Sequence, residues 1–295
     1  MPTSNLGQRC VVAAVGIPTV LTLLYLGNWI LGIALSALAA AGTQEVYRLA
    51  GYTGVDSFRL TGALGATALV LLGTWQQTFV TFAPWALMVI GILMLISLIL
   101  VVMDQGVRGG PMGAVSVTIF GSLYCGLSLS FIPLIIIIPE VEGWGEAVAV
   151  PWLGVAIIAL PLATTWIGDA VAFLAGTKWG KQKLVPAISP NKTWFGAWSG
   201  FSATVAVGIV WYLIMGPHLV GMPISSFWMA GLIGGVLGIA AQLGDLVISV
   251  FKREAGVKDS GTVFPGHGGV LDRIDSIALT VPVYYVALAL LVKIQ

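Results

Sequence analysis

Long apolar runs alternate with short polar connections along almost the whole chain. A helix that crosses a bilayer needs roughly 20 mostly apolar residues. On this criterion the pattern predicts nine spans, at residues 10–27, 29–48, 60–75, 79–103, 113–138, 150–176, 194–215, 226–250 and 274–292. The expected fold class is therefore all-α, a polytopic bundle of about nine transmembrane helices.

The composition also places most of the chain in lipid. Hydrophobic residues make up 58% of the sequence and charged residues 8%, and the mean hydropathy is +1.00, which is far from the balance of soluble domains. The net charge is +1, and no basic, aromatic-rich segment indicates nucleic-acid binding. Cys10 and Cys125, both in apolar runs, are too few for a disulfide framework or a zinc site.

Positive charge lies on one side of the predicted bundle. Twelve of the 13 Lys and Arg residues fall in alternate connections, the exception being Lys293, and the connection at 139–149 is acidic. Cytoplasmic loops of membrane proteins carry the excess of Lys and Arg. We therefore expect a multi-pass protein of the cell inner (plasma) membrane with a cytoplasmic N-terminus, an external C-terminus and two long cytoplasmic loops, 177–193 and 251–273.

Four acidic residues interrupt the C-terminal spans near their cytoplasmic ends, namely Asp169, Asp245, Asp272 and Asp275. Charged side chains within spans are costly and usually mark a function. A structural role, such as helix capping by Asp272 or a buried hydrogen bond at Asp169, is the alternative for either residue alone. Helical spacing places Gln242, Asp245 and Ser249 on one face, and Asp272 with Asp275 on another.

The expected chemistry is phosphate binding by carboxylates, a metal ion and the two long loops. Carboxylates on neighbouring helices offer the hard oxygen ligands that suit Mg²⁺. The loops add lysines, arginines, hydroxyls and glycines, including Gly268 and Gly269, which let backbone N–H groups approach a polyphosphate. Neither loop contains a GxxxxGK[ST] or GxGxxG motif, so a soluble-type nucleotide fold is excluded.

The segment 249–276, SVFKREAGVKDSGTVFPGHGGVLDRIDS, closely resembles the signature of the phosphatidate cytidylyltransferases, also called CDP-diacylglycerol synthases. A second block, Gly168 and Asp169 through KLVPAISPNKTWFG, resembles an upstream motif of that family, and QLGD at 242–245 and EVYRLAG at 45–51 also fit. The resemblance is strong from about 160 to 280. We accordingly divide the chain into an N-terminal transmembrane region, 1–140, of about five helices, and a C-terminal catalytic transmembrane region, 141–295, with the two cytoplasmic loops.

The resemblance implies a reaction of CTP with phosphatidate that gives CDP-diacylglycerol and pyrophosphate in phospholipid biosynthesis. It implies Mg²⁺ as cofactor, leaves a second cation such as K⁺ open, and suggests a homodimer by analogy alone. Asp245 and Asp272 are then the expected metal ligands. The other expected catalytic residues are Lys252, Arg253, Lys258, Asp259, His267, Arg273 and Asp275. The expected substrate-binding residues are Asp169, Ser189, Pro190, Lys192, Thr193, Gln242, Ser249, Gly268 and Gly269.

Roles follow from charge. The cations of the second loop, Lys252, Arg253, Lys258 and Arg273, are assigned to phosphates, as are Ser189, Lys192 and Thr193 of the first block. His267 either hydrogen-bonds a phosphate or transfers a proton. The sequence departs from the family pattern at Asn191, where a lysine is common, and at Phe195, where a glutamate is common, so neither side chain receives a role.

The residues are consistent with this reaction because it needs no protein nucleophile. A phosphate monoester is already ionised near neutral pH, its second pKa being about 6, so no strong base is required either. Two alternatives remain open. One is a CTP-dependent polyprenol or phytol kinase on a related scaffold, and the other is a transporter with a carboxylate relay. Acyl-chain preference, oligomeric state and the groups that contact cytosine are not fixed by the sequence.

Overall fold

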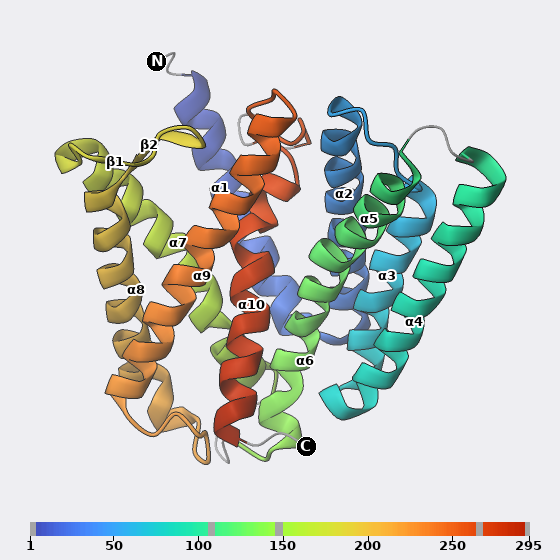
Figure 1. Cartoon of the computed structure of the whole chain (residues 1–295). Helices are drawn as coiled ribbons and strands as arrows, with labels where there is room; N and C mark the ends of the chain where they lie inside the picture. The colour runs from blue at the N-terminus through green and yellow to red at the C-terminus, as the bar shows by residue number, and fades with distance from the viewer. Residues whose placement is uncertain (1–3, 106–109, 145–149, 264–267, 293–295) are drawn as a thin grey trace. The chain divides into compact units, whose positions relative to one another are not determined.

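The computed structural model describes residues 4–105, 110–144, 150–263 and 268–292 of the chain. These residues form helices almost throughout (Figure 1). The α-helices are α1 (Ser4–Leu26), α2 (Asn28–Tyr52), α3 (Arg59–Gln76), α4 (Phe79–Leu100), α5 (Pro111–Gly121), α6 (Ser128–Val141), α7 (Val150–Trp179), α8 (Trp194–Met215), α9 (Phe227–Glu254) and α10 (Leu271–Val292). Short helical pieces of other types are η1 (Val101–Gln105), η2 (Ser122–Leu127) and η3 (Gly216–His218).

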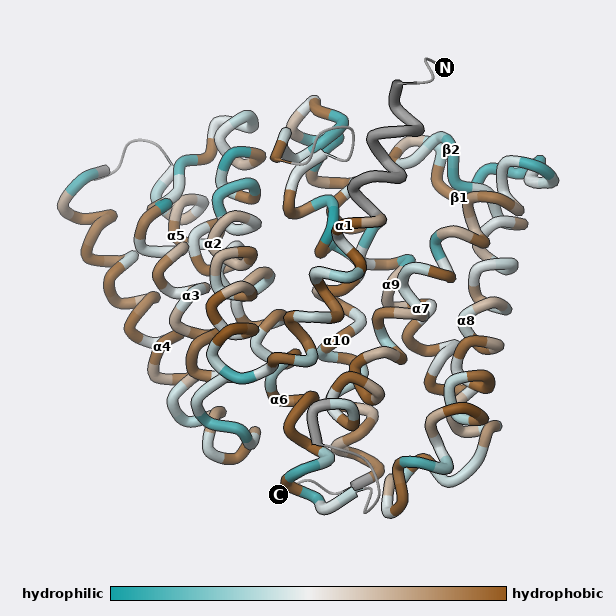
Figure 2. Tube along the Cα trace, turned by 180° about the vertical axis from the view of Figure 1, so that it is seen from behind, coloured by the Kyte–Doolittle hydropathy of each residue, from teal (hydrophilic) through white to brown (hydrophobic). Residues whose placement is uncertain are grey.

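Each predicted span corresponds to a helix or, for 113–138, to the continuous run of α5, η2 and α6. Among the described residues, seven helical segments are long and apolar enough to cross a membrane. Figure 2 shows apolar residues along the length of α4 and polar residues gathered at the hairpin between α7 and α8. The chain is an all-α, polytopic membrane protein, as the sequence predicted.

Two helix ends differ from the prediction in a way that matters for the site. Helix α9 continues to Glu254, beyond the predicted end at residue 250, and α10 begins at Leu271 instead of 274. Lys252, Arg253 and Asp272 therefore lie on helices and not in a loop. Hydropathy misses these turns because their charged residues interrupt the apolar pattern while the backbone hydrogen bonds continue.

The chain divides into two compact units. Unit 1 comprises Met1–Leu134 and Phe251–Ile274, and unit 2 comprises Ile135–Val250 and Asp275–Gln295. The segment that carries most of the signature residues thus belongs to the same compact unit as the N-terminal helices. The expected functional division at residue 140 stays a prediction.

Unit 1 is organised around the buried ring of Tyr47 on α2. Its hydroxyl lies 2.7 Å from the carbonyl oxygen of Thr118 on α5, to which it donates a hydrogen bond. Glycines at 62 and 121 leave room for the ring, because a Cβ at either position would clash with it. Helices α2, α3 and α5 consequently approach closely around Tyr47. This packing holds the part of α2 that also carries Glu45, two residues away.

Unit 2 is held by small residues at helix contacts. Gly234 of α9 packs so closely on the Thr204 carbonyl of α8 that a Cβ there would overlap it. Such small residues allow backbones to approach in membranes, and a Cβ at Gly231, Gly234, Gly235 or Gly238 of α9 would in each case meet a residue of α8. The result is a close pairing of α8 with α9 that sets the position of the polar end of α9.

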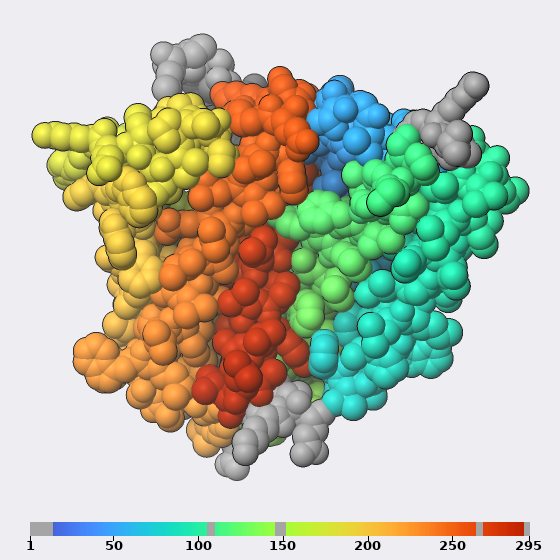
Figure 3. Space-filling model, viewed as in Figure 1, coloured from blue at the N-terminus to red at the C-terminus, as the bar shows by residue number. Residues whose placement is uncertain are grey.

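A two-stranded antiparallel hairpin joins α7 to α8, where the sequence predicted only a loop. Strand β1 (Lys183–Val185) pairs with β2 (Ser189–Thr193), with Lys183 opposite Thr193 and Val185 opposite Ser189. In Figure 3 the residues of this hairpin, coloured yellow, lie at one end of α8. Thr193 ends β2 and begins α8, since its Oγ1 accepts a hydrogen bond from the Gly196 N–H at 3.1 Å in an N-cap.

Candidate functional site

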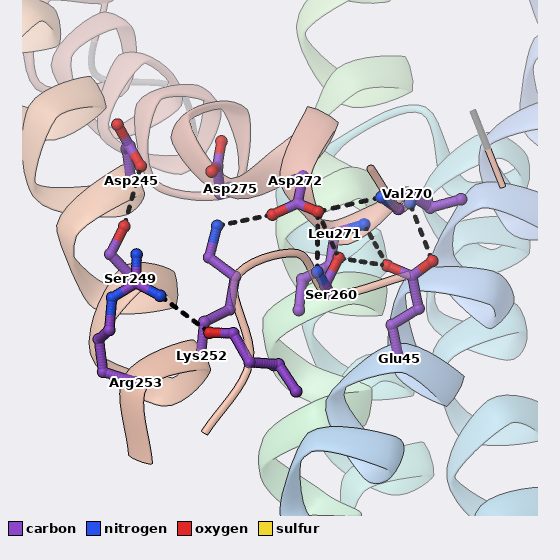
Figure 4. A network of polar contacts seen from close by, with 12 residues as sticks. Glu45, Asp245, Ser249, Lys252, Arg253, Ser260, Val270, Leu271, Asp272 and Asp275 are labelled. Atoms are coloured by element: carbon purple, nitrogen blue, oxygen red, sulfur yellow. Dashed lines mark hydrogen bonds and ion pairs between the residues drawn. The ribbon is translucent and has the colours of Figure 1, made fainter. Parts of the chain in front are cut away.

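In unit 1, the carboxylate of Asp272 lies in the first turn of α10 and is saturated with donors. Its Oδ1 accepts from the Lys252 ammonium at 2.6 Å, and its Oδ2 accepts from the N–H groups of Ser260 (2.9 Å) and Gly269 (3.0 Å). The Ser260 hydroxyl, which Asp272 shares with Glu45, lies 2.9 Å from Oδ2. Only 6% of the side chain is exposed. Figure 4 shows this network. Asp272 thus closes the loop that precedes its helix and pairs with the Lys252 ammonium, whereas none of these donors belongs to α10 itself.

Glu45 of α2 forms the second half of this network. Its carboxylate accepts from the N–H groups of Val270 (3.0 Å) and Leu271 (2.8 Å) and from the Ser260 hydroxyl (2.7 Å) (Figure 4). The residue is 2% exposed. A buried carboxylate requires such a complete set of donors. The C-terminal signature segment is therefore tied to a helix of the N-terminal half.

The other expected residues of unit 1 differ in exposure. Arg253 donates to the carbonyl of Val257 at 2.9 Å, which closes the end of α9. Lys258, Asp259 and Arg273 are exposed and thus accessible to a ligand. Gly268 has a φ of +80°, a conformation that favours glycine, and Gly269 is buried beside Glu45. His267 lies outside the described residues.

In unit 2, Asp245 of α9 is paired with the hairpin. Its Oδ2 lies 2.8 Å from the Lys192 ammonium, and the two side chains are 31% and 26% exposed. Ser249 donates to Oδ1 at 3.3 Å, and Gln242 donates to the Ala197 carbonyl of α8 at 3.2 Å. The predicted polar face of Gln242, Asp245 and Ser249 is confirmed, and its partners are β2 and the start of α8.

The remaining expected residues of unit 2 differ in their exposure and contacts. Asp275 is 9% exposed and accepts from the Ser276 N–H at 2.7 Å. Gly244, next to Asp245, lies so close to the Asp275 carbonyl that a side chain would not fit, so α9 and α10 cross here. Asp169 is exposed on α7 and has a polar partner. Ser189 and Pro190 lie on β2, half-buried and exposed respectively.

The two carboxylates expected to bind metal differ in how well they fit Mg²⁺. Among the described residues, no group of three or more His, Cys, Asp or Glu side chains converges on one point. Mg²⁺ usually uses only one or two protein carboxylates together with substrate phosphates and water. Asp245 fits this use, because it is half-exposed and already holds a cation. Asp272 could bind a metal ion only through Oδ1, and only if Lys252 moved away, because its Oδ2 already accepts hydrogen bonds from two backbone N–H groups.

Glu45 and Ser260 were not predicted as site residues from the sequence. Glu45 lies inside the second predicted span, and a charged side chain in a span is a signal of function that could have found it. Ser260 carries no such signal in isolation. Its importance follows from a contact with a residue 215 positions away.

A sequence model described as the Cytidylyltransferase family matches residues 7–291. A phosphatidate cytidylyltransferase of Synechocystis is 29% identical over 100% of this chain and 99% of its own length. Proteins of the same name from Staphylococcus epidermidis and Rickettsia prowazekii are 40% and 41% identical over 46% and 44% of this chain, which corresponds to 50% and 57% of their own lengths.

Proposed function

Because the chain belongs to the cytidylyltransferase family, we propose that it is a membrane-embedded phosphatidate cytidylyltransferase that makes CDP-diacylglycerol and pyrophosphate from CTP and phosphatidate. The observation that carries the proposal is the family match across residues 7–291, together with a relative of that name aligned along its whole length. The geometry supports it, because a carboxylate is paired with a lysine in each unit, and in unit 1 the backbone of Gly268 and Gly269 lies beside Asp272.

The proposed reaction is a direct displacement. An oxygen of the phosphatidate phosphate attacks the α-phosphorus of CTP, a new P–O bond forms, and the bond from the α-phosphorus to the oxygen bridging to the β-phosphate breaks. Pyrophosphate leaves with that electron pair. The attacking monoester is already ionised near neutral pH, so no proton has to be removed by His267 or any other side chain. The difficulty is the repulsion between two anions, which cationic groups reduce.

We assign Asp245 and Asp272 to the metal and their lysines to phosphate. When bound, Mg²⁺ would neutralise charge on the CTP phosphates and on the departing pyrophosphate. Each carboxylate is now neutralised by an ammonium group, Lys192 at 2.8 Å and Lys252 at 2.6 Å. Lys192 and Lys252, which lie beside these carboxylates, would offer their ammonium groups to phosphate oxygens of the substrates.

Other residues are assigned by exposure and charge. Arg253, Lys258 and Arg273, all exposed, are proposed to bind phosphates together with the backbone at Gly268 and Gly269. In unit 2, Ser189 and Thr193 are proposed to contact the substrate phosphate; Thr193 is 3% exposed, and its Oγ1 already accepts from Gly196. In the structure Thr193 therefore serves as the N-cap of α8. Asp259 and Asp275 remain proposed catalytic residues, and Asp169, Pro190, Gln242 and Ser249 remain proposed substrate contacts.

The membrane context of the proposal follows from charge. We propose that the protein resides in the cell inner (plasma) membrane with its N-terminus and active site in the cytoplasm, where CTP is available, and its C-terminus outside. A second cation such as K⁺ and a homodimer belong to the same proposal by family analogy.

The decisive experiment follows the label of CTP labelled at the α-phosphate. With purified protein, Mg²⁺ and phosphatidate, we expect label to pass into the organic phase while pyrophosphate appears in equal amount, and a chelator should stop both. A polyprenol or phytol kinase would instead transfer the γ-phosphate and release labelled CDP. Release of CDP without lipid-bound cytidine would refute the proposal. Absence of CTP consumption with any lipid acceptor would favour the transporter.

A further inference from the structure

We propose that Glu45 is a positioning residue for the active site: its buried carboxylate holds the backbone at Val270 and Leu271 and thereby places Asp272. The expected effect of Glu45 on turnover rests on the proposed function, whereas its role in holding Val270, Leu271 and Asp272 in place does not. Glu45 is buried, and its carboxylate is bonded to Val270, Leu271 and Ser260, so its effect on the reaction would pass through Ser260 and Asp272.

The contacts are specific to a carboxylate. Oε1 accepts from the Val270 N–H at 3.0 Å, and Oε2 accepts from the Leu271 N–H at 2.8 Å. These two N–H groups lie at the start of α10, where the first helical N–H groups lack partners within the helix and the macrodipole favours an anion. The α2 helix thus supplies, from 225 residues away in the sequence, the acceptors that fix where α10 begins.

The glycines around Glu45 provide a second, independent observation. A Cβ at Gly269 would overlap both carboxylate oxygens of Glu45, and a Cβ at Gly261 would overlap Oε1. Neither glycine is at a positive φ in this structure. Their small size is therefore needed for space and not for backbone conformation, which means that the segment is closed around the Glu45 carboxylate.

Ser260 links Glu45 to Asp272. Its hydroxyl oxygen lies 2.7 Å from Glu45 Oε2 and 2.9 Å from Asp272 Oδ2. A hydroxyl has one proton and can donate to only one of these oxygens at a time. Both carboxylates therefore compete for the same donor, and a displacement of Glu45 is transmitted to Asp272 through one side chain.

The competing explanation is that Glu45 only stabilises the fold. The two explanations differ in their consequences. A fold-stabilising carboxylate affects how much protein is folded, whereas a positioning residue affects the turnover of protein that is folded. The experiment therefore needs a local measurement at the contact and a kinetic measurement normalised to folded protein.

The first measurement is amide hydrogen exchange in the full-length protein, using Glu45→Gln. Glutamine keeps the shape but offers one acceptor oxygen, so either Val270 N–H or Leu271 N–H would face an amide NH₂ group. We expect exchange at these two amides to become about tenfold faster or more. Thr43→Val is the matched control. Thr43 is buried on the same helix, and its hydroxyl donates to the carbonyl of Gly121, the last residue of α5, and not to the Val270–Leu271 segment. It should leave exchange at Val270 and Leu271 unchanged.

The second measurement is turnover at saturating CTP and phosphatidate, per folded molecule. We expect kcat of Glu45→Gln to fall about tenfold or more while Thr43→Val keeps normal turnover. Ser260→Ala should leave exchange at Val270 and Leu271 normal, since both acceptors remain, but should lower kcat several-fold because the link to Asp272 is lost. Gly269→Ala should resemble Glu45→Gln, since its methyl group overlaps the carboxylate.

The outcomes separate the proposals. Unchanged exchange in folded Glu45→Gln would overturn the positioning role, and faster exchange with normal kcat would reduce Glu45 to a stabilising residue. If Glu45→Gln does not fold, a normal kcat in Ser260→Ala overturns the link, and a lowered one supports it. If the wild-type protein transfers no cytidylyl group, the proposed function fails, while the exchange result still decides whether Glu45 holds the segment.

Discussion

At the residue scale, both carboxylates expected to bind metal are held by lysines in the structure. Lys192 lies 2.8 Å from Asp245, and Lys252 lies 2.6 Å from Asp272. The pairs differ in enclosure, since Asp245 is 31% exposed and Asp272 is 6% exposed. Exposed pairs contribute little to stability, whereas removing one partner of an enclosed pair leaves an uncompensated charge. Substitutions at the two sites should therefore separate binding from folding.

We predict that Asp245→Asn and Asp272→Asn each lower kcat/KM by on the order of 100-fold or more, because each removes a charged ligand from the transition state. Asp245→Asn should keep a near-normal unfolding midpoint, whereas Asp272→Asn should lower it, since Lys252 is then left without its partner. Ser249→Ala should be milder than either, because a hydroxyl contributes less than a charged group. Steady-state kinetics and thermal unfolding in detergent measure both effects. Near-normal turnover in either Asn variant would remove that residue from the metal site.

The sequence could predict the charged residues of the site but not all of their contacts. Asp245 and Asp272 were found because a carboxylate in an apolar helix needs a partner. Glu45 satisfies the same rule and was missed, and its partners are two backbone N–H groups and a serine. Backbone donors have no side-chain signature, so nothing near Glu45 in the sequence indicates what it binds.

At the element scale, helices could be predicted well and their polar ends poorly. The bilayer thickness fixes the length of an apolar span, so the spans were located within a few residues. The hairpin β1–β2 was missed because its strands are short and contain Pro190 and charged residues, which give no alternating apolar pattern. It matters for the site because β2 carries Lys192 to Asp245.

The packing of α8 on α9 gives a test at this scale. At Gly234, a methyl group would overlap the Thr204 carbonyl, whereas nothing lies within 4 Å of a methyl group at Gly91 on α4. We predict that Gly234→Ala destabilises the protein by about 1–3 kcal/mol through overpacking and that Gly91→Ala does not. The unfolding midpoints of the two variants in the same detergent measure the difference. Equal midpoints would mean that this helix contact is not tight.

At the scale of the whole molecule, the one-sided distribution of charge was visible in the sequence and the composition of the compact units was not. Unit 1 combines the N-terminal helices with Phe251–Ile274. The contact that best shows this grouping, Glu45 to the Leu271 N–H, joins residues 226 positions apart. Hydropathy reports the environment of each span separately and contains no information on which spans share a unit.

The same distribution of charge predicts the membrane topology of the protein. Helix α7 separates the acidic connection at 139–149 from the lysine-rich hairpin, and its 30 residues are long enough to cross a bilayer. Exposed positions on either side are Glu142 and Lys181, and Thr262 is exposed in the second long loop. In a protein without Cys10 and Cys125, a single cysteine at position 181 or 262 should react with a membrane-impermeant maleimide only from the cytoplasmic side, and one at 142 only from outside.

The experiment uses sealed inverted vesicles and intact spheroplasts, with a permeabilised sample as the control that every cysteine can react. Cytoplasmic labelling at 181 and 262 would place both long loops in the compartment that contains CTP, as the positive-inside rule requires. Labelling of 142 and 181 from the same side would show that α7 does not cross the membrane. Labelling of 181 and 262 only from outside would invert the orientation, and the proposed enzyme would then be separated from its nucleotide.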